Sequence, residues 1–289
     1  MDFLLDSVLL GMEYALLALG VYISFRILNL PDLTVDGSFA FGMAVSTMLC
    51  AAGHPFAALL CGALAGALAG MVTAFLQTAC RIHPILAGIL TMSGLYTVNI
   101  TVLGGPNVSL LSAKKFFEPL GGEACAVTLV TLVVLLLVGG FFQTVGGLCI
   151  RAAGSNEDMV RASSINTVAV RFAALALSNA LVALSGAILA QCQGFGDVSA
   201  GSGMIVIGLA SVIIGEVLCG RRGVRIGLVS AVLGSVVYRI ILALALRYNL
   251  MSANALRLLS AVIVAATLAL PAMSAALRER QERKENRAC

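Results

Sequence analysis

The chain has 289 residues, of which 60% are hydrophobic and only 11% are charged. Its mean hydropathy of +1.03 excludes an ordinary soluble domain. A membrane-spanning helix needs ~20 apolar residues, so the composition indicates a polytopic membrane protein with little room for another domain. The net charge of +4 comes from loops and the tail, and it therefore indicates membrane topology and contact with lipid, not nucleic-acid binding.

About nine apolar runs are expected to cross the membrane as helices, so the predicted fold class is an all-α transmembrane bundle. The second and seventh runs are short, rich in glycine and preceded by polar segments that contain aspartate. Short, interrupted spans at corresponding places are typical of the broken helices of transporters. The runs lie at about 8–28, 37–52, 56–79, 84–103, 124–146, 172–192, 203–219, 226–246 and 255–275.

Two aspartates, Asp32 and Asp36, precede the second run and are flanked by Pro31 and Gly37. The proline and the glycine favour a turn that leads into a broken helix. In one interpretation, Asp32, Asp36 and the nearby Ser38 belong to a gate or a substrate path. In the other, both carboxylates cap the second helix and accept its free N–H groups.

The third run contains a doubled GxxxG pattern formed by Gly62, Gly66 and Gly70. Glycine at every fourth position makes a flat strip on a helix, so we expect another helix to approach this strip closely. In the fourth run, the polar side chains of Ser93 and Asn99 fit a substrate path or ordinary packing between helices.

The longest polar interruption with a positive bias covers residues 148–171. A polar segment between two apolar runs must lie outside the hydrocarbon, and its excess of arginine places it on the cytoplasmic side. The pattern predicts a turn at Gly154–Asn156 and then a short amphipathic helix from about Glu157 to Ile165. The acids Glu157 and Asp158 suit the first turn of that helix. The segment carries no catalytic group, and we interpret it as a docking surface.

Several polar residues surround the seventh run. Gln191 and Gln193 stand just before Gly194-Phe195-Gly196-Asp197, where they fit either a polar solute or hydrogen bonds between helices. Glu216 lies near the end of that run, and an ionisable group within a span is a functional hypothesis by default. An ion pair with Arg221 or Arg222 is the structural alternative. Arg239 lies deeper in the eighth run and needs a buried partner or a watery path.

The distribution of arginine and lysine predicts the amino-terminus outside and the carboxy-terminus inside. A transmembrane domain at 1–276 is then followed by a charged cytoplasmic tail at 277–289. With this topology, the segments that begin at Asp32 and Asp197 lie on opposite sides of the membrane. They are either an inverted repeat, which is a transporter signature, or a chance similarity in a glycine-rich chain.

Little in the chain points to an enzyme. The eight cysteines and two histidines are scattered, so we expect no disulfide framework and no metal site, and no nucleotide-binding P-loop is present. Gly194–Asp197 does match the GxGD motif of intramembrane aspartyl proteases. Those enzymes need a second, facing aspartate, and no Tyr-Asp pair occurs in a preceding span.

The chain resembles the permease subunits of bacterial ATP-binding-cassette importers, in the superfamily that handles branched-chain amino acids, ribose and other simple sugars. The resemblance covers residues from about 20 to 270 and is strongest to the short-chain branch, which is associated with amino acids. At Ser164 the family pattern has glycine. The stretches that carry the resemblance are Phe25–Ser38, Arg151–Asn156, Met159–Asn166, Leu177–Asn179, Gln193–Asp197 and Gly208–Glu216.

This resemblance implies a homodimer in the bacterial inner membrane that works by alternating access. A cytoplasmic ATPase subunit that binds ATP and magnesium would dock beneath it, and an extracellular lipoprotein would deliver an amino acid or another small solute. The chain itself would bind no cofactor. The alternative is an ion-coupled secondary transporter, which needs no ATPase. Segment 148–171 would be the coupling helix, with contacts from Arg151, Gly154, Asn156, Met159, Arg161 and Ala162.

Overall fold

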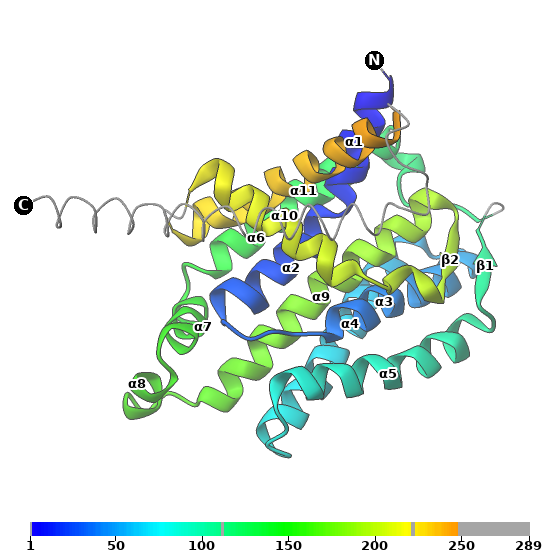
Figure 1. Ribbon diagram of the computed structural model, residues 1–289. Coiled ribbons are helices and arrows are strands. Elements are labelled where there is room, and N and C mark those ends of the chain that lie inside the picture. Colours follow the sequence, from blue (N-terminus) through cyan, green and yellow to red (C-terminus); the bar gives the residue numbers. More distant parts are fainter. Residues whose placement is uncertain (1, 111–112, 221–222, 248–289) are drawn as a thin grey trace, which may run out of the picture.

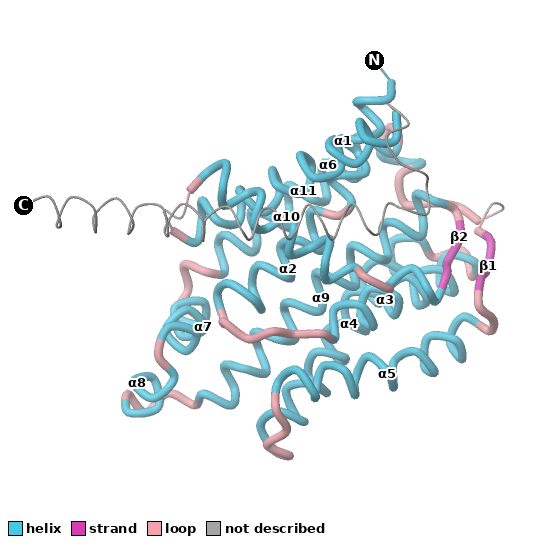
Figure 2. The backbone as a smooth tube through the Cα atoms, viewed as in Figure 1, coloured by secondary structure: helices cyan, strands magenta, loops and turns pink. Residues whose placement is uncertain are grey.

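The computed structural model describes residues 2–110, 113–220 and 223–247 and shows a helical bundle with one short pair of strands (Figures 1 and 2). Eight helical segments in this part of the chain are long and apolar enough to cross a membrane. The predicted all-α polytopic bundle is therefore confirmed. The ninth run and the charged tail lie outside the described residues. The eight segments are Leu4–Ile27, Thr34–Ala51, Pro55–Thr78, Pro84–Leu103, Glu123–Phe141, Thr167–Gln193, Val198–Cys219 and Val224–Arg247.

The first span is built from three helical pieces. Helix α1 (Asp2–Glu13) and helix α2 (Ala15–Val21) are separated at Tyr14, and a π-helical turn (Tyr22–Ile27) continues α2. Every residue of α2 is buried, because α9, α10 and α11 surround it. Irregular π-helical turns are frequent at functional sites, and this one faces the polar cluster around Glu216 described below.

Helices α3 (Thr34–Ala51), α4 (Pro55–Thr78) and α5 (Pro84–Leu103) follow. Both α4 and α5 begin with proline, which suits the first helical position because the missing N–H would have no intrahelical acceptor there. Helix α5 ends at Gly104, whose φ of 73° is a left-handed conformation that glycine adopts at little cost. A loop with a short strand β1 (Asn107–Ser109) and a 3₁₀ turn (Glu118–Leu120) leads to α6.

Helix α6 (Glu123–Phe141) is followed by two short helices, α7 (Val145–Ser155) and α8 (Glu157–Ala162), before α9 (Thr167–Gln193) begins. Figure 1 shows α7 and α8 protruding at one end of the bundle, away from the strands at the other end. The predicted turn at Gly154–Asn156 is partly wrong, because Gly154 and Ser155 form the last turn of α7. The predicted helix after it ends at Ala162 and not at Ile165.

Helix α9 is the centre of the bundle and packs against α2, α3 and α4. The glycine strip of α4 faces it: a Cβ atom on Gly66 would lie 2.3 Å from the backbone oxygen of Asn179, and one on Gly70 would lie 2.3 Å from that of Leu175. A Cβ atom on Gly62 would lie 3.0 Å from that of Ala187. These glycines let the two backbones approach as closely as small residues permit in membrane helices.

The last described elements are strand β2 (Phe195–Asp197), a 3₁₀ turn (Val198–Gly201), α10 (Met204–Cys219) and α11 (Val224–Arg247). Strand β2 pairs antiparallel with β1, with Val108 opposite Gly196. This pairing ties the loop before α6 to the end of α9. Helices α10 and α11 pack closely against each other, and α11 also covers α1.

Candidate functional site

A buried polar network joins the start of α3 to the middle of α9. Asn179 donates from Nδ2 to Oδ2 of Asp32 over 2.7 Å, and its Oδ1 accepts from the hydroxyl of Ser38 over 2.7 Å. Asp32 Oδ1 also accepts the backbone N–H of Thr34 over 2.9 Å, so Asp32 caps α3. All three network side chains are buried, which makes these hydrogen bonds important because a buried polar group without a partner is costly.

Asp36 lies in α3 but caps a different helix, α10. Its Oδ2 accepts the backbone N–H of Gly203 over 2.9 Å, and its Oδ1 accepts that of Ile205 over 2.8 Å. These N–H groups belong to the start of α10, where an acidic side chain satisfies free donors and complements the helix dipole. The starts of α3 and α10 therefore meet through one carboxylate. The structural interpretation therefore fits Asp32, and it is wrong for Asp36, which caps α10 and not its own helix.

The carboxy-terminal ends of α3 and α10 lie at different places in the bundle. The far end of α3 lies at the loop before α6, where the thiol of Cys50 donates to the backbone oxygen of Lys114 over 3.0 Å. The far end of α10 lies at the first span, where Glu216 binds Arg26. Helices α3 and α10 thus start together and run to different loops. The prediction that the segments before them lie on opposite sides of the membrane is therefore wrong where Asp36 meets Gly203.

A cavity of about 670 Å³ opens beside this junction. Asp36, Ser93 and Asn99 line it, whereas Asp32 and Ser38 lie in the buried network behind it. Asn99 donates from Nδ2 to the backbone oxygen of Gly37 over 3.3 Å, and its buried Oδ1 has no partner among the described residues. The remaining lining residues are Gly37, Ala40, Met92, Tyr96, Val198, Ser199, Gly201 and Ser202.

The residues at the end of α9 do not line this cavity. Gln191 is buried and accepts the backbone N–H of Phe116 over 3.0 Å while its amide donates to Ser46 and to the backbone oxygen of Pro55. It therefore makes hydrogen bonds between segments, and Gln193 is exposed. Asp197 caps the 3₁₀ turn by accepting the N–H of Ser199 over 2.8 Å.

Glu216 lies at the opposite end of α10 and binds the guanidinium of Arg26 through two contacts, one of which measures 2.7 Å. Arg221 and Arg222, one of which was expected to pair with Glu216, lie outside the described residues. Among the described residues, the partner of Glu216 is Arg26, near the end of the first span. A cavity of about 450 Å³ at this place is lined by both residues together with Arg151 and Gly154. The pair thus faces α7.

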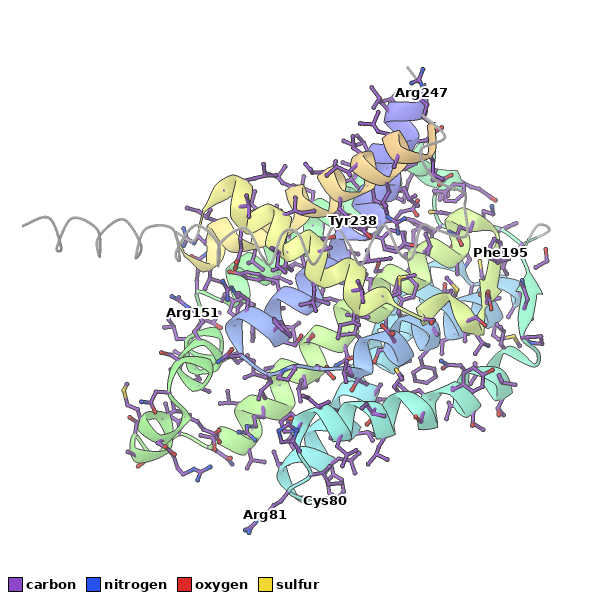
Figure 3. The ribbon with its side chains drawn as sticks, viewed as in Figure 1. Cys80, Arg81, Arg151, Phe195, Tyr238 and Arg247 are labelled. Carbon is purple, nitrogen blue, oxygen red and sulfur yellow. The ribbon has the colours of Figure 1, made fainter. Side chains whose placement is uncertain are left out.

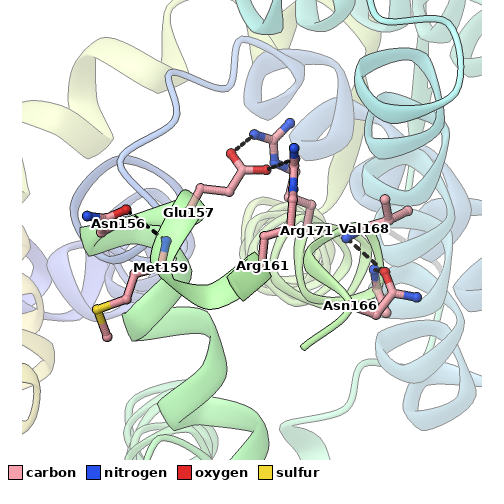
Figure 4. A network of polar contacts seen from close by, with 8 residues as sticks. Asn156, Glu157, Met159, Arg161, Asn166, Val168 and Arg171 are labelled. Atoms are coloured by element: carbon pink, nitrogen blue, oxygen red, sulfur yellow. Dashed lines mark hydrogen bonds and ion pairs between the residues drawn. The ribbon is translucent and has the colours of Figure 1, made fainter. Parts of the chain in front are cut away.

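Helix α7 packs tightly on the first span at Gly154, where a Cβ atom would lie 1.8 Å from the backbone oxygen of Ile27. Asn156 then caps α8 by accepting the N–H of Met159 over 3.1 Å. On α8, Glu157 binds both Arg161 and Arg171, as Figure 4 shows. Most of α8 is exposed, including Arg161 and Ala162, and the side chain of Met159 is 63% exposed.

Two further polar clusters could not be recognised from spacing. The Arg239 guanidinium stacks over the ring of Tyr14, 3.6 Å from its centroid, so an aromatic face is the buried partner that Arg239 requires. Beside it, a carboxylate oxygen of Glu13, a carboxylate oxygen of Glu123 and the Sγ atom of Cys192 lie within 4.8 Å of one another. These residues come from three distant parts of the chain.

The sequence matches the family described as "Branched-chain amino acid transport system / permease component" over residues 3–268. It is 33% identical over 269 residues to the tyrosine transport system permease protein of Clostridioides difficile, covering 92% of this chain and 90% of the relative. It is 36% identical to an uncharacterised protein of Rickettsia prowazekii, covering 69% and 72% of the two chains.

The autoinducer 2 import system permease protein LsrC of Escherichia coli is 28% identical over 76% of this chain and 65% of its own length. No solved structure matches the chain. Members of this family are transport permeases and not enzymes, which sets aside the aspartyl protease interpretation of Gly194–Asp197. A family match over nearly the whole chain and eight apolar helices agree with each other. The chain therefore belongs to the permease-component family of branched-chain amino acid transport systems, the membrane subunits of ATP-binding-cassette importers.

Proposed function

We propose that this chain imports an amino acid by alternating access and that a separate ATPase subunit drives the cycle through α7 and α8. The observation that carries the proposal is the protruding pair of short helices between the spans α6 and α9 (Figure 1). A permease without an ATPase has no need of such a surface. In this proposal, ATP and Mg²⁺ bind the ATPase, and this chain binds no cofactor.

The exposed face of α8 suits a protein partner. Met159 presents a flexible apolar side chain, which adapts well to a binding groove, and Arg161 stands one turn away from the acids at the start of the helix. In this assignment Met159 and Ala162 pack in the ATPase groove, while Asn156 and Arg161 make polar contacts. Only Val160 of α8 is buried against the permease, so the rest of the helix is available to a partner.

Contacts within the bundle connect this surface to the central junction. Gly154 of α7 touches the first span at Ile27, and Arg26, the residue before Ile27, binds Glu216 on α10. The start of α10 is in turn capped by Asp36. A displacement of α7 would thus act on α10, and through α10 on the cavity wall. In this assignment Arg151, which lines the cavity at Glu216, belongs to the coupling surface.

An amino acid fits the cavity at the junction of α3 and α10. Its volume of about 670 Å³ lies within the range of small-molecule sites, which also combine apolar walls with a few polar groups. The unpartnered Oδ1 of Asn99 is an acceptor for a substrate ammonium group, and Ser93 and Asp36 add polar atoms nearby. The name of the relative from C. difficile, which specifies tyrosine, also favours an amino acid.

The proposed orientation places α7 and α8 in the cytoplasm. The amino-terminus and the strands then lie outside, where an extracellular lipoprotein would deliver substrate. A second copy of the chain completes the path, because each type of importer in this class needs two membrane subunits. Gln193 and Asp197, at the outer end of α9, are placed at the entrance of the path in this orientation.

The test is purification of the tagged chain from its host in mild detergent, with mass spectrometry of the proteins that accompany it. Wild-type chain is expected to bring along an ATPase and a lipoprotein. Met159→Asp and Arg161→Glu are expected to lose the ATPase and to keep the lipoprotein, since both changes lie on α8.

Lys114→Glu is the matched control, because it reverses one exposed charge in the loop before α6, at the end of the bundle away from α8. It should leave the ATPase bound. If the wild-type chain emerges alone from every mild condition, or if all three variants retain the ATPase, α8 is not the coupling surface. Ion-driven uptake by the chain alone would then be the function to measure.

A further inference from the structure

A second polar cavity, of about 540 Å³, lies between the end of α4, the helix α8 and the start of α9. Three arginines line it, namely Arg81, Arg161 and Arg171, and Glu157 is the single acid among the lining residues. The cavity also lies at the amino-terminus of α9, a helix of 27 residues whose dipole adds positive potential there. Its electrostatic character therefore favours an anion.

A buried amide points to a missing partner at this place. Gln77 lines the cavity and is only 5% exposed, yet neither its Nε2 nor its Oε1 has a hydrogen-bond partner among the described residues. A buried amide with both atoms unpaired is costly. A ligand with both acceptor and donor groups, such as a phosphate next to hydroxyl groups, would satisfy it.

Glu157 positions two of the three arginines beside the cavity. Its carboxylate binds Arg161 over 3.1 Å and also binds Arg171, so it holds two guanidinium groups at one edge of the cavity (Figure 4). Arg81 extends from the turn between α4 and α5 at the same end of the bundle (Figure 3). Arginine is suited to phosphate, because its planar fork donates two parallel hydrogen bonds.

One edge of the cavity is apolar. Val168 of α9 lines it and is 47% exposed, whereas the exposed apolar side chains of α4, such as Val72 and Phe75, lie on the face of that helix away from Gln77. Exposed large apolar side chains on a membrane helix face lipid chains or another helix. A polar, basic cavity bordered by such a side chain has the chemistry of a lipid head-group site.

We propose that this cavity binds the phosphate-bearing head group of an anionic phospholipid, with its acyl chains leaving the cavity beside Val168. Gln77 donates to and accepts from the head group, and Arg81 and Arg171 bind its phosphate. The lipid fixes α4, at the edge of the bundle, to the base of α9 and to the exposed helix α8. Only the assignment to the cytoplasmic leaflet rests on the proposed function. Binding itself does not depend on the ATPase.

The experiment uses the full-length chain, stripped of lipid in detergent and titrated with short-chain phosphatidylglycerol or phosphatidylcholine under native mass spectrometry. Phosphatidylglycerol is expected to bind about tenfold more tightly than phosphatidylcholine. Gln77→Leu and Arg81→Gln are each expected to reduce that preference severalfold or abolish it. Arg225→Gln is the matched control, because Arg225 is an exposed arginine that lies outside this cavity.

Three outcomes would overturn the proposal: equal binding of the two lipids, an unchanged preference in both variants, or an equal loss in the Arg225 control. Glycerol phosphate is titrated as a separate arm. If it competes as strongly as the lipid, the ligand is a soluble phosphate and not a membrane lipid. Arg81→Gln keeps the test decisive if Gln77→Leu does not fold, since Arg81 is a surface residue. Loss of lipid binding with ATPase docking intact separates this proposal from the proposed function.

Discussion

Asp36 in α3 caps α10 at Ile205, a residue 169 positions further along the chain, over a hydrogen-bond distance of 2.8 Å. The same carboxylate accepts the N–H of Gly203. Helices α3 and α10 are thus joined at their starts by one side chain, and this side chain also lines the cavity beside the junction. A change at Asp36 should therefore affect stability and transport together.

Asp36→Ala should lower the free energy of unfolding by about 1–2 kcal/mol, the usual effect of removing a helix cap. Asp36→Asn should cost less, because an asparagine side chain still accepts one N–H. Denaturation in detergent, followed by circular dichroism, measures both. Asp158→Ala, at an exposed carboxylate on α8, is the control and should change stability by less than about 0.5 kcal/mol. Equal effects of Asp36→Ala and the control would contradict the cap.

Ser164 is one of three residues other than glycine with a positive φ, which is 60° here, in the part of the chain that the structure describes. The resemblance predicts glycine at this position, and the turn between α8 and α9 explains the preference. A left-handed conformation costs a residue with a Cβ atom about 1 kcal/mol.

Ser164→Gly should therefore raise the free energy of unfolding by about 0.5–1 kcal/mol, after allowance for the greater entropy of glycine in the unfolded chain. Ser163→Gly is the matched control, because Ser163 has a φ of −84° and should lose stability on the same change. Thermal melting of both purified variants distinguishes the two directions. A lower melting temperature for both variants would rule out strain at Ser164.

Glycines on α4 and α5 give a test in which the same substitution, glycine to alanine, should have opposite effects on stability. A Cβ atom on Gly66 would lie 2.3 Å from the backbone oxygen of Asn179, whereas one on Gly94 of α5 would meet nothing within 4 Å. Gly66→Ala must separate α4 from α9, and overpacking of this kind costs about 1–3 kcal/mol. Gly94→Ala should be neutral or stabilising by up to about 1 kcal/mol, because alanine favours a helix. Unfolding titrations of the two variants check both signs, and equal losses would contradict the close approach.

The sequence predicted the helical bundle well, because apolar runs of membrane length are a local signal. It also predicted that the glycines of α4 lie at a close contact, although not that α9 is the neighbour. The two aspartates before the second run were expected to cap the second helix or to line a path. Asp36 lines the cavity but caps α10, a helix that the sequence did not indicate as its neighbour.

The pairs that organise the site were beyond sequence reasoning, because they join residues far apart in the chain. Arg221 and Arg222, the arginines considered as partners of Glu216, lie outside the described residues. The described partner of Glu216 is Arg26, 190 positions away in the chain. Gln191 was expected to line a substrate path or to form hydrogen bonds between helices, and in the structure it binds the backbone of Phe116 in a distant loop. Charge and polarity indicate that such a residue needs a partner, but the topology of the bundle decides which one.

The acceptor on Asn99 tests the substrate site directly. Asn99→Leu removes the Oδ1 atom that has no partner among the described residues and leaves a side chain of similar size. If this oxygen binds the ammonium group of an amino acid, the KM for uptake should rise by about tenfold or more, because a hydrogen bond to a charged group contributes about 1.5–3 kcal/mol. Thr101→Val is the control on the same helix, because its hydroxyl bonds only to its own helix at Thr97 in the interactions that the structure describes. Uptake by proteoliposomes that contain the whole complex measures KM, and the amount of complex in the membrane is compared by immunoblot. An unchanged KM for Asn99→Leu at normal complex levels would place substrate recognition elsewhere on the path.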